Sequence, residues 1–129
     1  NTPPPPRRYS SSNDAVRGLA VDAADKYVYV VGEHDRIEEY YALTGVHSRS
    51  ASMAPRSSAT CVSVVGSIIV VAGDGLGITL LTSSTLSRTG ELRGHRAPVT
   101  CIGTVPRCTG GILWTGCADG TVRSWSLGV

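Results

Sequence analysis

The stretch GHRAPVTCIGTVPRCTGGILWTGCADGTVRSWSL, residues 94–127, decides the fold predicted for this chain. Apolar and polar residues alternate over residues 99–102, and a second β-rich run spans residues 112–116. The pair Asp119-Gly120 separates this second run from a third, residues 121–126. An Asp-Gly pair with β-rich sequence on both sides is the strongest short-range signal of a hairpin turn. The stretch therefore predicts three consecutive antiparallel strands.

Four residues of this stretch can form one hydrogen-bonded group: His95, Thr115, Asp119 and Trp125. The imidazole of His95 can accept from the Thr115 hydroxyl with one nitrogen and donate to Asp119 with the other. The indole N–H of Trp125 can only donate, and the Thr115 hydroxyl can accept it. Such a group would rigidify a sheet, because every polar member is satisfied. A His near an Asp and a Thr is also compatible with a catalytic relay.

The same stretch resembles one WD repeat, the four-stranded blade unit of β-propellers. In that family, a structural tetrad is formed by a His after Gly, a Ser or Thr in the second strand, an Asp in the hairpin turn and a Trp in the third strand. The matching residues are His95, Thr115, Asp119 and Trp125. The resemblance therefore favours a structural role for these residues over a catalytic relay.

Two weaker repeats precede this one. Gly32, Gly73 and Gly116 each end a second β run, and they lie 41 and 43 residues apart, within the period of about 40–45 residues of the WD repeat. Third strands are predicted at Arg36–Tyr41 and Ile78–Thr82, and fourth strands at about 46–51 and 87–93. The place of Trp125 is taken by Tyr41 in the first repeat and by Leu80 or Leu81 in the second.

We expect an all-β chain of three four-stranded antiparallel blades of a WD-repeat β-propeller, at about 14–52, 53–93 and 94–129, after a Pro/Ser-rich tail at 1–13. Three blades leave two apolar faces open, and closed rings have four to eight blades. Either further blades of a larger protein complete the ring, or two copies of this chain form a homodimer with six blades. In the second case, residues 8–10 of one copy would supply the outer strand that the third repeat of the other lacks.

The composition excludes several classes of protein. A chain of 129 residues fits one domain, and its net charge of +2 is too small to indicate nucleic acid or an anionic membrane as partner. The sequence contains no run of about 18 apolar residues, so no transmembrane helix is predicted. The four cysteines lack the spacing of a zinc site. They are interpreted as reduced thiols of an intracellular, cytoplasmic protein rather than as a disulfide framework.

Three other motifs do not support a catalytic or ligand site. The glycine-rich residues 73–77 precede a strand, whereas a dinucleotide site needs a helix there. Residues 33–35 are adjacent in sequence, and three adjacent side chains rarely bind one metal ion. Glu38 and Glu39 should point to opposite faces of a strand. We therefore expect no metal, no cofactor and no enzyme activity.

The resemblance implies a non-catalytic platform for protein partners, whose identity the sequence does not reveal. The loops before each first strand and the hairpins between second and third strands should share one rim. There Arg56 and Arg96 could together bind a carboxylate or phosphate. The alternative is an accessory propeller domain of an enzyme chain (a phosphatase, kinase, ubiquitin ligase or motor) whose catalytic part lies outside this sequence. The predicted rim residues are His34, Asp35, Arg56, Asp74, Arg96 and Ala118.

Overall fold

All regular secondary structure in the part that the computed structural model describes is β-strand. The described residues are 3–6, 15–22, 24–32, 36–52, 59–73, 77–105 and 110–128. Eleven strands run through these ranges. The all-β class predicted from the sequence is confirmed. Within the same ranges, no helix has the length and apolar character needed to cross a membrane.

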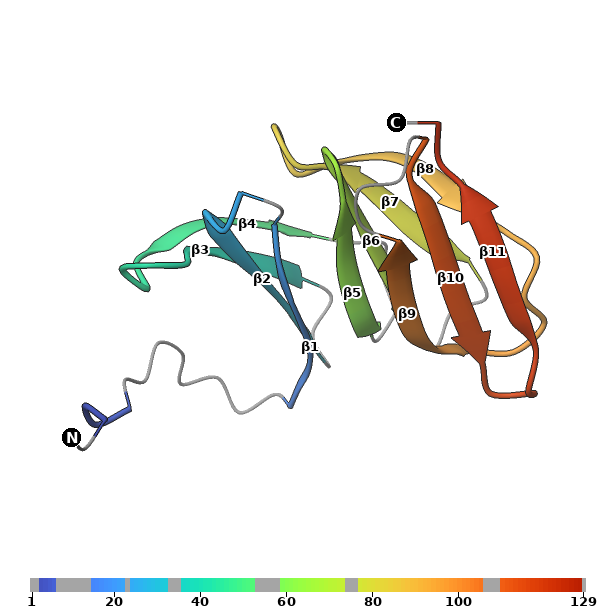
Figure 1. The fold of residues 1–129 in the computed structure, drawn as a ribbon, viewed down its shortest axis with the longest axis horizontal. Helices are drawn as coiled ribbons and strands as arrows, with labels where there is room; N and C mark the ends of the chain where they lie inside the picture. Colours follow the sequence, from blue (N-terminus) through green and yellow to red (C-terminus); the bar gives the residue numbers. More distant parts are fainter. Residues whose placement is uncertain are drawn as a thin grey trace.

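The strands form three antiparallel sheets, in which neighbouring strands are consecutive in sequence (Figure 1). The first sheet contains β1 (Val16–Val21), β2 (Tyr27–Gly32), β3 (Arg36–Tyr41) and β4 (His47–Ser52). The second contains β5 (Ala59–Val65), β6 (Ile68–Gly73), β7 (Ile78–Thr82) and β8 (Ser87–Leu92). The third contains β9 (Val99–Val105), β10 (Ile112–Cys117) and β11 (Val122–Ser126). The predicted third and fourth strands agree with these bounds to within one residue.

In the described residues the third sheet lacks an outer strand, as the sequence predicted for the third repeat. Among the described residues it holds three, in the order β11-β10-β9. No counterpart of the outer strands β4 and β8 pairs with β11 in this part of the chain. Residues 8–10, which were expected to supply such a strand, lie outside the described residues.

The three sheets follow one another across the molecule, with β5 beside both β1 and β9 (Figure 1). The central strand β6 reads Ile-Ile-Val-Val-Ala-Gly because both of its faces are buried. Ile69 and Val71 pack in the core between the first and second sheets. Val70 and Ala72 point the other way, into the core between the second and third sheets. The alternation of side chains along one strand therefore supplies both cores.

Matching β-bulges align the sheets and correct the repeat alignment. Each sheet has a register shift at the same place between its first and second strands. The pairs beside these shifts are Val16 with Gly32, Ala59 with Gly73, and Val99 with Cys117. Cys117, rather than Gly116, therefore stands at the place of Gly32 and Gly73. The sequence alignment chose Gly116 because this glycine lies one residue before Cys117, the residue that the strand pairing places opposite Val99.

The same register assigns the place of Trp125 in the other sheets. Trp125 lies opposite the second residue of β10, and the corresponding residues of β3 and β7 lie opposite the second residues of β2 and β6. The pairs are Leu113 with Trp125, Val28 with Tyr40, and Ile69 with Leu81. Tyr40 rather than Tyr41 therefore occupies this place in the first sheet, and Leu81 occupies it in the second.

Candidate interaction site

His95 and Trp125 both lie within hydrogen-bond distance of the Thr115 hydroxyl. The Nε1–H of Trp125 donates to Thr115 Oγ1 at 2.9 Å, and His95 Nε2 lies 2.6 Å from the same oxygen. Because the indole can only donate, the Thr115 oxygen accepts from Trp125, and a second lone pair and the hydroxyl proton remain for the bond with Nε2. His95 is 5% exposed and Thr115 1%. The buried Thr115 hydroxyl therefore joins His95 to Trp125.

Asp119 is linked to this group by Thr121, which the sequence interpretation did not include. The Thr121 hydroxyl lies 3.5 Å from His95 Nδ1 and 2.6 Å from Asp119 Oδ1. Its backbone N–H donates to the same carboxylate oxygen at 3.0 Å. These two hydrogen bonds from Thr121 hold the pKa of Asp119 at about 2. The order Asp-Gly-Thr could have indicated the link, since an Asp in a turn often accepts from the backbone two residues later.

The position of His95 suits a structural role better than a catalytic one. Both ring nitrogens face hydroxyl groups of this chain, from Thr115 and Thr121. The ring is buried, so a substrate would have to displace one of these partners. In the described ranges, no three His, Cys, Asp or Glu side chains gather as ligands for a metal ion.

The loop before β9 and the β10–β11 hairpin meet at one edge of the third sheet. The Ala118 N–H donates to Pro98 O at 2.9 Å, and the Cys117 thiol donates to Ala97 O at 3.0 Å. These contacts bring Arg96 and Ala118, both exposed, to the same edge. The other predicted rim residues lie outside the described residues: His34, Asp35, Arg56 and Asp74.

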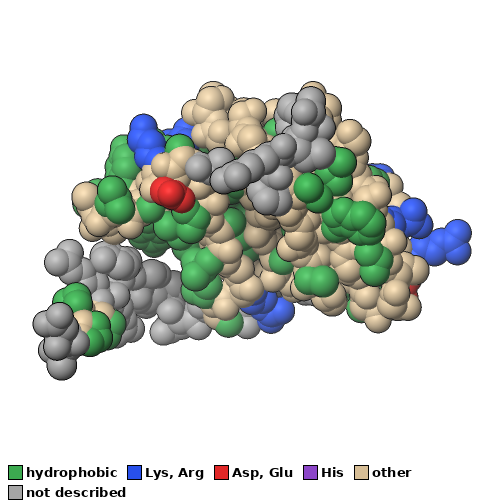
Figure 2. All heavy atoms as spheres, viewed as in Figure 1, with side chains coloured by type: hydrophobic (Ala, Val, Ile, Leu, Met, Phe, Trp, Pro, Cys, Tyr) green, Lys and Arg blue, Asp and Glu red, His purple; other side chains and the backbone are tan. Residues whose placement is uncertain are grey.

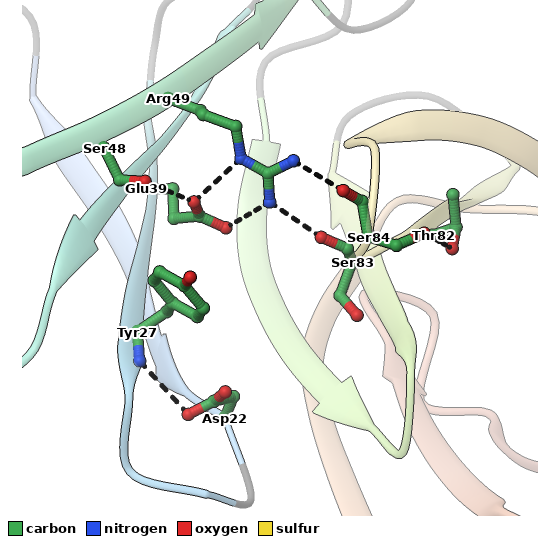
Figure 3. A network of polar contacts seen from close by, with 8 residues as sticks. All are labelled: Asp22, Tyr27, Glu39, Ser48, Arg49, Thr82, Ser83 and Ser84. Atoms are coloured by element: carbon green, nitrogen blue, oxygen red, sulfur yellow. Dashed lines mark hydrogen bonds and ion pairs between the residues drawn. The ribbon is translucent and has the colours of Figure 1, made fainter.

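An ion pair joins the first sheet to the β7–β8 turn of the second (Figure 3). The Glu39 side chain is fully buried, and Arg49 binds both of its oxygens, at 2.9 Å from Nε and 2.8 Å from Nη2. The guanidinium also donates to the carbonyl oxygens of Ser83 at 2.8 Å and Ser84 at 2.7 Å. Arg49 therefore clamps a buried carboxylate of one sheet to the backbone of the next.

Hydrogen bonds keep the Glu39 carboxylate charged inside the protein. Burial alone would raise its pKa, but hydrogen bonds from Arg49, Ser48 and Tyr29 outweigh burial and hold the pKa below its usual range. Burial and the neighbouring Glu39 raise the pKa of the Tyr29 hydroxyl, which therefore stays a neutral donor. Glu38 points to the opposite face of β3, so the two adjacent glutamates do not form an acid pair.

Comparison with known proteins gives matches of structure only. No protein-family model matches the sequence, and no curated protein sequence matches it. The structure of U3-55K superposes with a TM-score of 0.83 and the crystal structure of the RRP9 WD40 repeats with 0.82, each at 16% identity. Each alignment covers 94% of this chain and 38% of the other.

The chain has the fold of WD-repeat propeller blades. Each of the three sheets is one blade, and the fold predicted from residues 94–127 is confirmed. The chain spans well under half the length of the two propeller chains that it matches. The described residues therefore form part of an arc of blades, and no closed ring is present.

The first blade leaves an apolar face without a neighbouring blade among the described residues. Val16, Leu19 and Val21 of β1 are 58%, 64% and 52% exposed. Further side chains of this face line a shallow hollow beside Leu19. In register, Val28, Val30 and Tyr40 of this face match Ile69, Val71 and Leu81, by which the second blade packs on the first.

The third blade leaves open the face that corresponds to the other side of a blade, the side by which the second blade packs on the third. Trp114 is 48% exposed and Val122 65%. In register they match Val70 and Ile78, with which the second blade packs on the third. Figure 2 shows hydrophobic side chains at the surface of both the first and the third blade. The arc therefore ends in two faces that correspond to the two sides of a blade junction.

Proposed function

We propose that this chain is a non-catalytic protein–protein interaction scaffold, a partial WD-repeat propeller from a larger multidomain protein. The observation that carries the proposal is the pair of open blade faces, which lie in register with the faces buried between the blades. Packed blades also hold the rim loops in fixed positions, and loops on a rigid scaffold are suited to recognition.

The partner is proposed to bind at the rim that holds Arg96 and Ala118. The Arg96 guanidinium is exposed and offers a planar set of donors to a carboxylate or phosphate of a partner protein. The loops of the first two blades would extend the same rim. They contribute the proposed contacts His34, Asp35, Arg56 and Asp74.

Binding measurements with two charge-reversal variants test this site. Proteins captured from cell extract are purified, and their Kd values are measured with the wild type, Arg96→Glu and Arg88→Glu. Arg88 lies at the start of β8, at the end of this strand away from Arg96. It carries the same charge as Arg96, so its variant controls for the change in net charge. Arg96→Glu should weaken binding about threefold to tenfold, and Arg88→Glu should not. The proposal fails if no purified protein binds directly, or if both variants weaken binding equally.

In isolation, two copies are proposed to close a six-bladed ring, with the first blade of each copy on the third blade of the other. The equivalent registers support this arrangement, because each new contact would repeat a junction that the chain already contains. A two-fold rotation would close the ring and cover all four open faces at once. Residues 8–10 of each copy are proposed to pair with β11 of the other.

A second proposal is an accessory propeller domain in an enzyme chain, such as a phosphatase, kinase, ubiquitin ligase or motor. The 38% coverage of the matched propellers supports a longer natural protein. Sequencing the transcript on both sides of this segment tests the idea. A catalytic motif in the adjoining sequence would support it, and a transcript without one would rule it out.

We propose an intracellular, cytoplasmic location and no direct contact with nucleic acid or membranes. Cys61, Cys101 and Cys117 are free thiols, which suits a reducing compartment. The net charge of +2 gives little attraction for polyanions. Microscopy of the tagged chain tests the location. Binding to DNA or to anionic vesicles at low salt would contradict the second statement.

A further inference from the structure

A polar cavity of about 560 Å³ lies between the first and second blades, where the β1–β2 and β7–β8 turns approach each other. These turns lie at the opposite end of the strands from the C-terminal ends of β2 and β6. The equivalent end of β10 lies beside the loop that holds Arg96, so the cavity is on the rim opposite to Arg96. Ser48 and Arg49 form part of its wall. The cavity is otherwise lined by Asp22, Tyr27, Tyr29, Tyr41, Ser83 and Ser84.

Three tyrosine rings gather on one side of this cavity. Tyr27 and Tyr41 lie opposite each other on β2 and β3, with ring centroids 5.3 Å apart and planes 38° apart. The buried Tyr29 ring is 6.4 Å from that of Tyr27. The faces of aromatic rings attract cations within about 6 Å of the centroid. The Lys26 ammonium already lies 5.2 Å from the Tyr27 centroid, so an ammonium group is accommodated at this ring.

The charges around the cavity favour a cation over an anion. Arg49 faces the cavity, but four of its five donors are used by Glu39 and by the carbonyls of Ser83 and Ser84. Asp22 Oδ1 accepts from the backbone N–H groups of Lys26 at 2.7 Å and Tyr27 at 3.2 Å. No ion pair to Asp22 occurs in the described part of the chain. The Arg49 charge is therefore matched by Glu39, whereas Asp22 forms no ion pair there, and the nearby Lys26 ammonium competes for the face of Tyr27.

We propose that this cavity binds the ammonium group of a lysine side chain presented by a protein partner. Asp22 supplies the opposite charge, and the Tyr27 and Tyr41 rings attract the ammonium and pack against the lysine methylenes. Figure 3 shows Asp22 and Tyr27 on the first blade facing the space below the Ser83–Ser84 turn of the second. The site lies on the opposite rim from Arg96, so the test of this proposal does not depend on the partner proposed for the Arg96 rim.

An NMR titration of the full chain with a capped Gly-Lys-Gly peptide tests the proposal. Saturable shifts are expected for the amides around Tyr27, Tyr41 and Ser83. The same peptide with an acetylated lysine carries no charge and should give no saturable shifts. Equal binding of both peptides, or shifts confined to other parts of the chain, would overturn the proposal.

Charge variants in one turn sharpen the test. Asp22→Asn keeps the oxygen that accepts the two backbone N–H groups but removes the charge, so the turn is preserved. It should weaken binding of the lysine peptide about threefold. Asp25→Asn removes one charge from the same turn at a residue that does not line the cavity, and should leave the affinity within twofold. Equal losses from both variants would contradict a direct contact with Asp22.

Variants of an aromatic ring and of the competing lysine side chain test the role of the rings independently, through the affinity for the lysine peptide. Tyr41→Leu removes a ring that is 39% exposed and should weaken binding about threefold. Lys26→Gln removes the ammonium that lies over Tyr27 and should tighten binding about twofold. Each variant is compared with the wild type by its amide spectrum and Tm, so that a folding defect is recognised. Unchanged affinity in both variants of preserved fold would overturn the role of the rings.

Discussion

At the level of single residues, a series of hydrogen bonds runs through the third blade. Trp125 donates to Thr115, which is also hydrogen-bonded to His95. The other ring nitrogen of His95 faces the Thr121 hydroxyl, which donates to Asp119. The series begins at a group that can only donate and ends at a carboxylate that can only accept. Thr115 is the member on which two buried partners depend.

Thr115→Val should therefore destabilise the chain more than its change in shape implies. The substitution keeps the β-branched form but leaves the Trp125 N–H and His95 Nε2 without a partner. The free energy of unfolding should fall by about 2 kcal/mol, measured by urea denaturation. Thr89→Val, at an exposed position of β8, is the matched control and should change it by less than about 0.5 kcal/mol. Equal losses of unfolding free energy in the two variants would show that the buried Thr115 hydroxyl stabilises the chain no more than an exposed threonine hydroxyl does.

The lowered pKa of Glu39 predicts a loss of stability in acid. Folding favours the ionised carboxylate, so its contribution is complete above the pKa of the unfolded chain, near 4.3. The contribution is lost as the pH falls through the lower folded pKa. Between about pH 5 and pH 3, the wild type should lose more unfolding free energy than Glu39→Gln does. Parallel pH profiles of the two proteins would contradict the prediction.

At the level of elements, the clamp between the first blade and the β7–β8 turn depends on two matched charges. Arg49→Met would leave Glu39 charged and buried without its partner. Because the Arg49 side chain is 36% exposed, solvent screening lowers the expected loss to about 2 kcal/mol. The double variant Glu39→Gln/Arg49→Met should lose less than Arg49→Met alone. A double variant as unstable as the sum of the two single variants would contradict coupling between them.

The open face of β1 predicts a different outcome for two similar substitutions. Leu19 lies on this face and is 64% exposed, whereas Leu43 in the β3–β4 turn is 94% exposed. Leu19→Ser should weaken self-association roughly tenfold or more, because it removes apolar surface from the proposed junction. Leu43→Ser should leave it unchanged. Sedimentation equilibrium of both variants measures the effect, and equal behaviour would exclude this face from the contact.

The sequence predicts elements whose signals are local. Alternation along residues 99–102, the Asp119-Gly120 turn and the spacing of about 40 residues predict the strands and their repetition. The third strands at Arg36–Tyr41 and Ile78–Thr82 match the observed bounds. Each of these signals depends on neighbours in the chain, so one sequence is enough to read them.

Other features depend on contacts that no local pattern records. Arg49 meets the Ser83 and Ser84 carbonyls 34 and 35 residues further along the chain. Register is set by the bulge beside Val99, so the glycine match at Gly116 was one residue off. The site at the tyrosines depends on how two blades approach each other, which the sequence does not predict.

For the whole molecule, the three blades combine two described rim surfaces with two open ends. Arg96 lies on one rim, and the Asp22 cavity lies on the other. The open faces of the first and third blades end the arc, which spans 38% of the two propeller chains that it matches. Each open face has the register of a junction that the chain already contains, so the two faces are expected to pair.

The solution mass of the chain tests this pairing, by light scattering over a concentration series. Ring closure by two copies predicts one stable species at twice the 13.5 kDa of the single chain. A mass of 13.5 kDa at every concentration would contradict it, because the open faces would then stay uncovered without association.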